Sequence, residues 1–341
     1  MTAVHAQRAG TRGGHTLRAV DSHTCGQPTR VLIDGLPDLE YATLGEAREQ
    51  FRAEHDWIRR CAVLEPHGHR SLFAAALVPA ADEACAIGVV FMDATGYHDM
   101  CGHATIGVVT TLVEQGFVEI ADGERKIAID TPAGRIDTRV RVVDGKAASV
   151  TFVNQPAFFL EAVTISTSVG EREVGIAYGG QWYAFVDAES FGLRIEPDAI
   201  DRLVSRAAEL RPAVAEAVTG ADPRTGARAE VENVMWTDRA AAGADGRNMP
   251  VNAAGGFDRS PCGTGTSARL ALLHAIGALG PGEPYVNAGV LGTTYTGRIA
   301  ELTKVGTHTA VVPEITGSAW VTGSSELWVD PDDPLGEGFL I

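Results

Sequence analysis

Short runs of β-branched and aromatic residues recur along the chain, and turn-forming residues separate them. Such runs predict β-strands, and the clearest of them span residues 29–33, 86–92, 126–129, 136–143, 149–153, 183–186, 309–312 and 318–322. Residues 1–20 contain Arg, Gly and His but no apolar run, so we expect a loose tail there. The segment 220–228, with Pro and two Gly, predicts an exposed loop.

Two apolar segments interrupt the strand pattern with helical spacing. The first follows Cys101 and is expected to stop at Gly116, and the second follows Cys262 and is expected to stop at Gly280. A third segment, 197–217, is amphipathic and charged and predicts a surface helix that a proline interrupts. Strands with a few helices, in no regular alternation, are typical of an α+β fold.

The two apolar helices begin with the same local motif. Cys101–Thr105 reads CGHAT and Cys262–Thr266 reads CGTGT, so both match C-G-x-small-T. The two cysteines are 161 positions apart (262 minus 101), which is close to half of the 341 residues. The repeat predicts two related halves, each with a cysteine where a loop enters a central helix.

A cysteine at a helix N-terminus lies beside unpaired backbone N–H groups and the positive end of the helix dipole. Both favour the thiolate, and the same N–H groups can bind an anion such as a carboxylate. The glycine after each cysteine lets a ligand approach the backbone. Two such cysteines on opposite sides of one ligand could remove a proton from a carbon and return one to its other face. The pair therefore predicts a racemase without a cofactor.

Other interpretations of these cysteines stay open on the motif alone. A single Cys-Gly before a helix is usually just a small residue at a helix entrance. A metal site with Cys101 and His103 lacks further ligands. Two activated thiols that face each other could form a redox disulfide.

The composition restricts the classes of partner that the protein can bind. The net charge is −16, from 28 Lys+Arg and 44 Asp+Glu, which argues against nucleic acid and anionic membranes. The length of 341 residues suggests two domains. No secretory signal or membrane span is evident, so we expect the protein in the cytoplasm. The chain has five cysteines, an odd number, and no C-x-x-C pair, so neither a disulfide framework nor a zinc ribbon is indicated. Cys61 and Cys85 are expected to be buried structural thiols.

Longer motifs resemble one family. The segments 100–107 (MCGHATIG) and 258–268 (DRSPCGTGTSA) closely resemble the two signatures of the proline racemase family. Further matches are DSHT from Asp21, PTR from Pro28, EPHGH from Glu65, TPAG from Thr131 and GSAWVTG from Gly317. The resemblance extends along nearly the whole chain.

The resemblance implies an α/β (α+β) fold of the diaminopimelate-epimerase-like type. Its two similar halves each wrap a curved mixed sheet around a central helix, and the active site lies in the cleft between them. The last strand is expected to return to the first half. The implied halves are therefore 1–153 plus 325–341, which carries Cys101, and 154–324, which carries Cys262.

The resemblance also implies roles for individual residues. Cys101 and Cys262 match the two acid/base thiols, and Asp258 matches the residue that binds the ring nitrogen of the substrate. The positions that bind the substrate carboxylate and nearby polar groups match Gly102, His103, Gly263 and Thr264. The alternatives are a capping or packing role for His103 and an ion pair of Asp258 with Arg259. No cofactor and no metal is implied.

Within the family, a Cys–Cys pair is typical of proline racemases and 4-hydroxyproline 2-epimerases, whereas trans-3-hydroxyproline dehydratases have Thr in place of the second Cys.

Two features of this chain depart from the usual family pattern. Residues 23–28 read HTCGQP where the family usually has HTxGEP, so Gln27 replaces a carboxylate and Cys25, expected in a turn, is extra. The segment 251–257, where substrate-selecting residues fall, matches neither the proline nor the hydroxyproline pattern.

We therefore expect a 4-hydroxyproline 2-epimerase, with proline racemase as the alternative. A 3-hydroxyproline dehydratase and a non-catalytic imino-acid-binding homologue are further alternatives. The expected partner is a small imino acid, and a homodimer is the default assembly.

Overall fold

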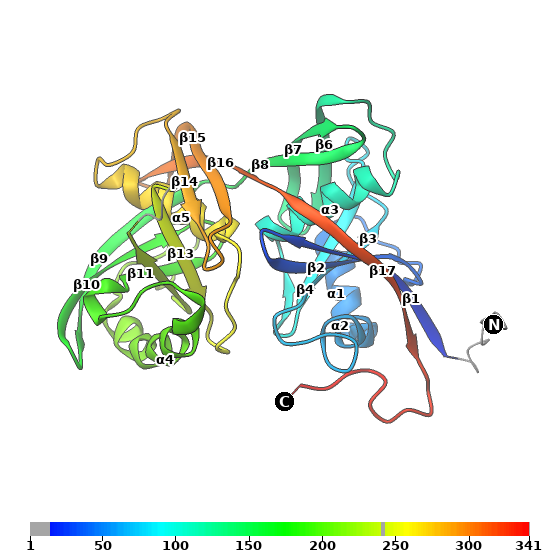
Figure 1. The fold of residues 1–341 in the computed structure, drawn as a ribbon, viewed down its shortest axis with the longest axis horizontal. Helices are drawn as coiled ribbons and strands as arrows, with labels where there is room; N and C mark the ends of the chain where they lie inside the picture. Colours follow the sequence, from blue (N-terminus) through cyan, green and yellow to red (C-terminus); the bar gives the residue numbers. More distant parts are fainter. Residues whose placement is uncertain (1–13, 240–242, 341) are drawn as a thin grey trace, which may run out of the picture.

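The computed structural model describes residues 14–239 and 243–340, which form two lobes joined by strands (Figure 1). The first lobe contains β1 (His15–Thr24), β2 (Gln27–Asp34), α1 (Leu44–Glu54), α2 (Asp56–Val63), β3 (Phe73–Val78), β4 (Ile87–Asp93), β5 (Gly96–His98), α3 (Gly102–Glu114), β6 (Gly123–Thr131), β7 (Gly134–Val143) and β8 (Lys146–Val153).

The second lobe contains β9 (Ala157–Thr167), β10 (Gly170–Tyr178), β11 (Trp182–Asp187), the 3-10 turns η1 (Glu189–Phe191) and η2 (Pro197–Ala199), α4 (Ile200–Ala217), β12 (Asn233–Asp238), β13 (Gly246–Val251), α5 (Gly263–Ala275), β14 (Pro284–Ala288), β15 (Thr294–Val305) and β16 (His308–Gly317). The last strand, β17 (Ala319–Val329), runs back across the first lobe (Figure 1).

One strand pairing joins the lobes, and a second ties the last strand to the first lobe. In the first, β16 pairs antiparallel with β8, from Glu314 opposite Val153 to Gly317 opposite Val150. In the second, β17 pairs antiparallel with β1 over the full length of both strands. The strands of the described residues thereby form one hydrogen-bonded network of 17 strands. The chain returns to the first lobe through β17, and the residue-level division at 153/154 and 324/325 stays a prediction.

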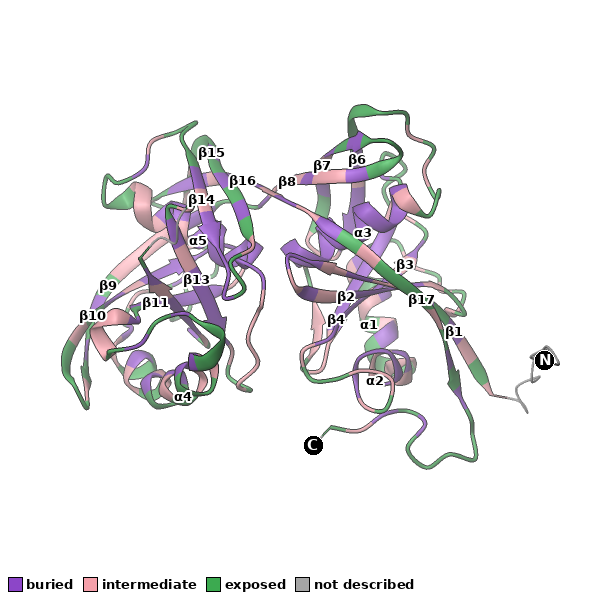
Figure 2. Cartoon of the chain, in the orientation of Figure 1, coloured by how far each residue is buried: buried purple, intermediate pink, exposed green. Residues whose placement is uncertain are grey.

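Each lobe is built around one central helix. Every residue of α3 from Gly102 to Val113 is buried (Figure 2). The helix ends as predicted, because Gly116 has a φ of 72° and the N–H of Phe117 donates to the carbonyl of Leu112 at 2.9 Å. This left-handed glycine cap satisfies the last carbonyls of the helix.

The second central helix, α5, is buried at its N-terminal end and ends earlier than predicted. Its last residue is Ala275 rather than a residue beside Gly280. Gly277 adopts a φ of 75° and the N–H of Ala278 donates to the carbonyl of Leu273 at 2.8 Å, which closes the helix with the same kind of cap. Ile276, expected on the buried stripe, is 64% exposed as a result.

All eight predicted strands lie within observed strands or extend one residue beyond them. The expected tail is wrong for residues 15–20, which belong to β1 and pair with β2 and β17, whereas residues 1–13 lie outside the described part. The predicted break at Pro212 is also wrong, because α4 continues through it. Pro212 and Ala208 are both exposed, so water can reach the carbonyl that the missing N–H leaves unpaired.

Two helices, α1 and α2, were not predicted. Five of the eleven residues of the first are charged and it buries only Leu44, Ala47 and Phe51, and the second has eight residues. Both were therefore too weakly patterned for recognition from apolar spacing. The segment 220–228 is the mostly exposed loop that was predicted. No helix in the described part of the chain combines the length and apolar character of a membrane span.

Candidate active site

The N-termini of α3 and α5 face each other where the lobes meet. A Cβ atom added to Gly102 would lie 3.0 Å from the Cα of Gly263 and 2.9 Å from Cζ of Phe152. A Cβ atom added to Gly263 would lie 3.0 Å from the Cα of Gly102. The sequence suggested that these glycines admit a ligand to the backbone. What the structure shows is that these glycines let the two helix N-termini approach each other.

A cavity of about 680 Å³ opens at this junction, and its walls come from both lobes. It is lined by all seven residues that the sequence singled out: Cys101, Gly102, His103, Asp258, Cys262, Gly263 and Thr264. The fold thus brings together two motifs that are 161 positions apart (262 minus 101).

Cys101 lies at the start of α3 beside a histidine. Its carbonyl accepts the N–H of Thr105 at 2.9 Å, and its Sγ lies 3.2 Å from Nδ1 of His103. Burial lowers the pKa of His103 to about 3, so the imidazole is neutral. The ring also packs edge-on against Phe73, with 5.0 Å between ring centroids. His103 therefore packs in the core and contacts the thiol as well.

Cys262 lies at the start of α5 and caps the helix with its own side chain. The N–H of Gly265 donates to its Sγ at 3.3 Å. The hydroxyl of Tyr183 lies 3.5 Å from the same sulfur and 2.6 Å from the hydroxyl of Thr264. Cys262 has a φ of 65°, and its N–H donates to the Oγ of Ser260 at 3.1 Å. A positive φ is rare for a residue with a Cβ and is typical of functional sites.

Burial favours the protonated form of both thiols. Burial raises the pKa of the Cys101 thiol well above its usual value. Burial also raises the pKa of Cys262 to about 12, and the charge of Asp258 adds to this. The N–H groups of Ala104 and Gly265 lower these pKa values, as the helix N-terminus argument predicted. Burial outweighs them because a buried thiolate loses its hydration.

Asp258 contributes a carboxylate to the cavity wall. Its Oδ1 accepts the N–H of Ser260 at 2.8 Å. Burial nevertheless raises the pKa of Asp258 to about 6, so the group is charged above that pH. The guanidinium of Arg259 lies over the ring of Phe257 instead, 4.8 Å from its centroid. Asp258 is thus available to a ligand with a positive charge.

Sequence reasoning did not identify Tyr183 as a site residue. It lies on β11, is 2% exposed, and contacts both Cys262 and Thr264. Its position in an apolar strand run gave no sign of a polar role. Only the packing of β11 against α5 places its hydroxyl at the second thiol.

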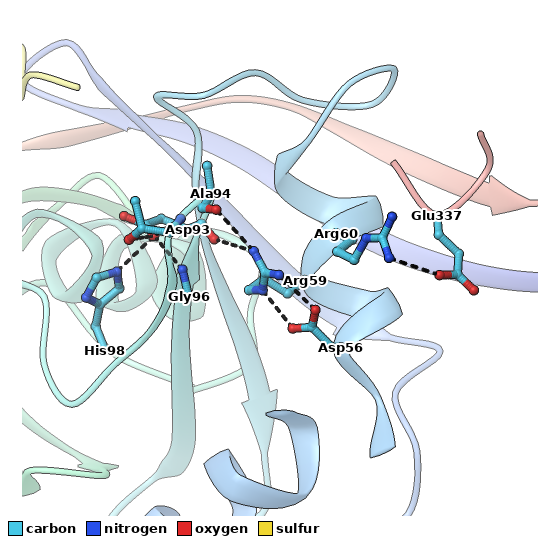
Figure 3. A network of polar contacts seen from close by, with 9 residues as sticks. Asp56, Arg59, Arg60, Asp93, Ala94, Gly96, His98 and Glu337 are labelled. Atoms are coloured by element: carbon cyan, nitrogen blue, oxygen red, sulfur yellow. Dashed lines mark hydrogen bonds and ion pairs between the residues drawn. The ribbon is translucent and has the colours of Figure 1, made fainter. Parts of the chain in front are cut away.

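The cavity wall beside Cys101 carries a second polar group that sequence reasoning missed. Nε2 of His98 lies 3.0 Å from Oδ1 of Asp93, and the His98 ring stacks on Phe73 with 5.2 Å between centroids. Figure 3 shows how α2 supports this group. Arg59, paired with Asp56, donates to the carbonyl of Asp93 at 3.1 Å. This network holds the loop between β4 and β5 at the cavity.

The remaining cysteines lie where the sequence suggested. Cys61 and Cys85 are buried, and burial raises the pKa of each to about 11, so both are thiols. Cys25 lies in the two-residue turn between β1 and β2 with a φ of 50°, followed by Gly26 with a φ of 99°. Two positive φ values are typical of a tight hairpin turn.

Two similar lobes, each with a central helix that presents a cysteine to a shared cavity, define the diaminopimelate-epimerase-like class. A solved structure of a hydroxyproline epimerase from Agrobacterium vitis, with bound trans-4-hydroxy-L-proline, has a similar fold. The likeness is one of the overall fold: the two chains are 32% identical, the match covers 97% of both, and they superpose with a TM-score of 0.86.

Sequence comparison agrees with the structure. Residues 19–340 match the family described as proline racemase. A proline racemase from Clostridioides difficile is 38% identical over 329 residues, covering 96% of this chain and 98% of that protein. A 4-hydroxyproline 2-epimerase from Streptosporangium roseum is 40% identical over 336 residues, covering 97% and 100%. The chain belongs to the proline racemase family, as its motifs predicted, and is an isomerase of the amino-acid racemase or epimerase type.

Proposed function

We propose that this protein inverts the configuration at Cα of a proline-type imino acid by a two-thiol acid/base mechanism without a cofactor. The preferred substrate is 4-hydroxyproline, and proline is the alternative. The observation that supports this most directly is the placement of Cys101 and Cys262 at the N-termini of two facing helices on one cavity. The names of the relatives support the choice of substrate class.

In the proposed reaction, the thiolate of one cysteine takes the Cα proton while the thiol of the other donates its proton to the opposite face. One C–H bond breaks and one forms, so the carbon is inverted and the two sulfurs exchange protonation states. The substrate carboxylate gains charge as the proton leaves. Backbone N–H groups at Gly102 and Gly263, with the side chains of His103 and Thr264, are proposed to stabilise it.

Asp258 is proposed to bind the ring ammonium of the substrate. A charge-assisted hydrogen bond to a secondary ammonium needs an anionic acceptor at this position. The charge of Asp258 raises the pKa of Cys262. A bound ammonium compensates that charge, so substrate binding itself favours formation of the thiolate.

Deuterium exchange tests the reaction and selects the substrate. The purified protein is incubated in D₂O without added cofactor, with trans-4-hydroxy-L-proline and separately with L-proline, and Cα deuteration and chirality are followed. Inversion with deuterium incorporation supports the two-thiol reaction and identifies the preferred substrate. No exchange with either compound refutes both assignments.

Two other activities need a third substrate and a binding measurement. A 3-hydroxyproline dehydratase would consume trans-3-hydroxy-L-proline, but this chain has Cys262 where those enzymes have Thr. A non-catalytic homologue is suggested by Gln27 and by the unusual segment 251–257. Thermal stabilisation by an imino acid without turnover would favour that alternative.

The assembly and the domain division are also proposals. The proposed halves are 1–153 with 325–341 and 154–324, and the pairing of β17 with β1 supports the return of the last strand to the first half. A homodimer in the cytoplasm remains the expectation from sequence. Light scattering on the purified protein measures the oligomeric state.

A further inference from the structure

Cys262 has a backbone conformation that residues with a Cβ atom rarely adopt. Its φ is 65° and its ψ is 111°, and strained backbone of this kind persists only where the surroundings fix it. Cys101, at the matching position of the first lobe, has an extended backbone with a φ of −143°. The strain is thus confined to one of the two cysteines, so groups in the second lobe must hold it.

The peptide group between Pro261 and Cys262 is hydrogen-bonded at both of its ends. Its N–H donates to Oγ of Ser260 at 3.1 Å, and its carbonyl accepts the hydroxyl of Thr266 at 3.1 Å and the side-chain amide of Asn287 at 3.3 Å. The same amide donates to Oγ1 of Thr266 at 2.8 Å. A peptide group is planar, and φ of Cys262 is the rotation about the bond that follows it. Hydrogen bonds that fix this plane therefore fix φ as well.

The three side chains that hold the peptide group lie behind the cavity, in the frame of the second lobe. Each is fully buried, and none is among the described residues that line the cavity. Asn287 lies on β14, where it pairs with Gly246 of β13 on one side and Tyr295 of β15 on the other. A Cβ atom added to Gly289, just beyond this strand, would lie 2.7 Å from the carbonyl oxygen of Arg259. The end of β14 thus packs directly against the segment that leads into α5.

The matching threonine of the first motif makes no such bond. Thr105 occupies the position in C-G-x-small-T that Thr266 occupies in the second motif. Its hydroxyl is buried and has no hydrogen-bond partner among the described residues. The hydroxyl at this position is therefore used at one helix only, the helix whose cysteine is strained.

We propose that Thr266 and Asn287 are positioning residues that hold Cys262 at its positive φ and thereby hold its sulfur at the cavity. In this conformation Sγ accepts the N–H of Gly265 at 3.3 Å. If φ relaxes to a negative value, the Cβ atom swings relative to the helix and this hydrogen bond is lost. The inference rests on the proposed role of Cys262 as an acid/base thiol, because a displaced sulfur transfers a proton less efficiently.

Variants of nearly unchanged size remove these hydrogen bonds selectively. Thr266→Val replaces the hydroxyl by a methyl group, and Asn287→Leu removes the amide donor without adding a charge. Thr266→Ser keeps the hydroxyl and serves as the rescue. The matched control is Thr105→Val, which removes a buried hydroxyl that bonds to no described residue. Urea denaturation shows which variants are folded.

The first measurement compares the two cysteines within one molecule. The protein is treated with iodoacetamide at pH 8 without substrate, and site-resolved mass spectrometry follows the alkylation rates of Cys262 and Cys101. Loss of the bond to the Gly265 N–H lowers the share of thiolate at Cys262. The ratio of the Cys262 rate to the Cys101 rate should therefore fall by about threefold to tenfold in Thr266→Val and Asn287→Leu. It should stay at the wild-type value in Thr266→Ser and Thr105→Val.

The second measurement is kcat/KM for Cα inversion of trans-4-hydroxy-L-proline. It should fall by about tenfold or more in Thr266→Val and Asn287→Leu and stay near the wild-type value in Thr266→Ser and Thr105→Val. An unchanged or higher alkylation ratio in folded Thr266→Val, or an undiminished kcat/KM, overturns the inference. A wild-type protein that turns over no imino acid refutes the proposed function instead. The alkylation ratio needs no substrate, so it still decides whether these residues hold Cys262.

Discussion

Replacing Gly263 by alanine should drive the two central helices apart. The added Cβ would lie 3.0 Å from the Cα of Gly102, where ordinary contacts are 3.4–4 Å, so one backbone must move by about 0.4–1.0 Å. The ring of Phe152, at 3.1 Å, blocks the adjacent direction. Overpacking of this kind costs about 1–3 kcal/mol in the free energy of unfolding. Because Cys262 moves with the helix start, turnover should fall by about 10–100-fold.

The assays are urea denaturation and the rate of Cα inversion followed by optical rotation. Gly45→Ala is the matched control, because Gly45 also lies in the first turn of a helix and its added Cβ would meet only Thr43 Oγ1, at 3.7 Å. That variant should be as stable and active as the wild type. The double variant Gly102→Ala, Gly263→Ala should lose less stability than the sum of the single losses, because both substitutions act on one contact. Wild-type stability and turnover in Gly263→Ala would refute the reasoning.

Three further predictions concern the chemistry. Cys101→Ser and Cys262→Ser should each abolish inversion, since a hydroxyl is far less acidic than a thiol; near-normal turnover in either variant would exclude the two-thiol mechanism. Tyr183→Phe removes a hydrogen bond that lowers the pKa of Cys262. Alkylation of Cys262 by iodoacetamide should therefore require a higher pH in this variant. An unchanged pH profile of alkylation would show that the hydroxyl does not act on the thiol. Asp258→Asn should raise KM about tenfold or more by removing a charge-assisted bond. Burial raises the pKa of Asp258 to about 6, above the pKa that the carboxyl has in the unfolded chain. Ionisation of Asp258 therefore destabilises the folded state once the pH exceeds the unfolded pKa. Without ligand, the Asp258→Asn variant should melt at a higher temperature than wild type at pH 8. A lower melting temperature would contradict this assignment.

Features that depend on neighbouring residues in the chain were predicted correctly from the sequence. The cap at Gly116 and the tight turn at Cys25 follow from residues that are neighbours in the chain. The end of α5 and the continuity of α4 through Pro212 were mispredicted. The end of α5 is set by the left-handed cap at Gly277, an earlier glycine than the one the sequence favoured, whereas α4 continues through Pro212 because the carbonyl left unpaired there faces solvent.

The sequence by itself determined the repeated C-G-x-small-T motif, the two apolar helices and the membership of the family. It also identified all seven candidate residues, because the two motifs carry them in short, specific runs. Tertiary structure alone decided how these residues interact. The hydroxyl of Tyr183 reaches a cysteine 79 positions away, and Gln27 reaches Arg259 across 232 positions.

The protonation state of the thiols was also decided by the tertiary structure. The helix N-terminus favours a thiolate, and this contribution could be read from the motif. Burial acts in the opposite direction and is stronger, because it removes water from the sulfur. Burial arises only when two lobes close over the helix ends, so no local pattern in the chain encodes it.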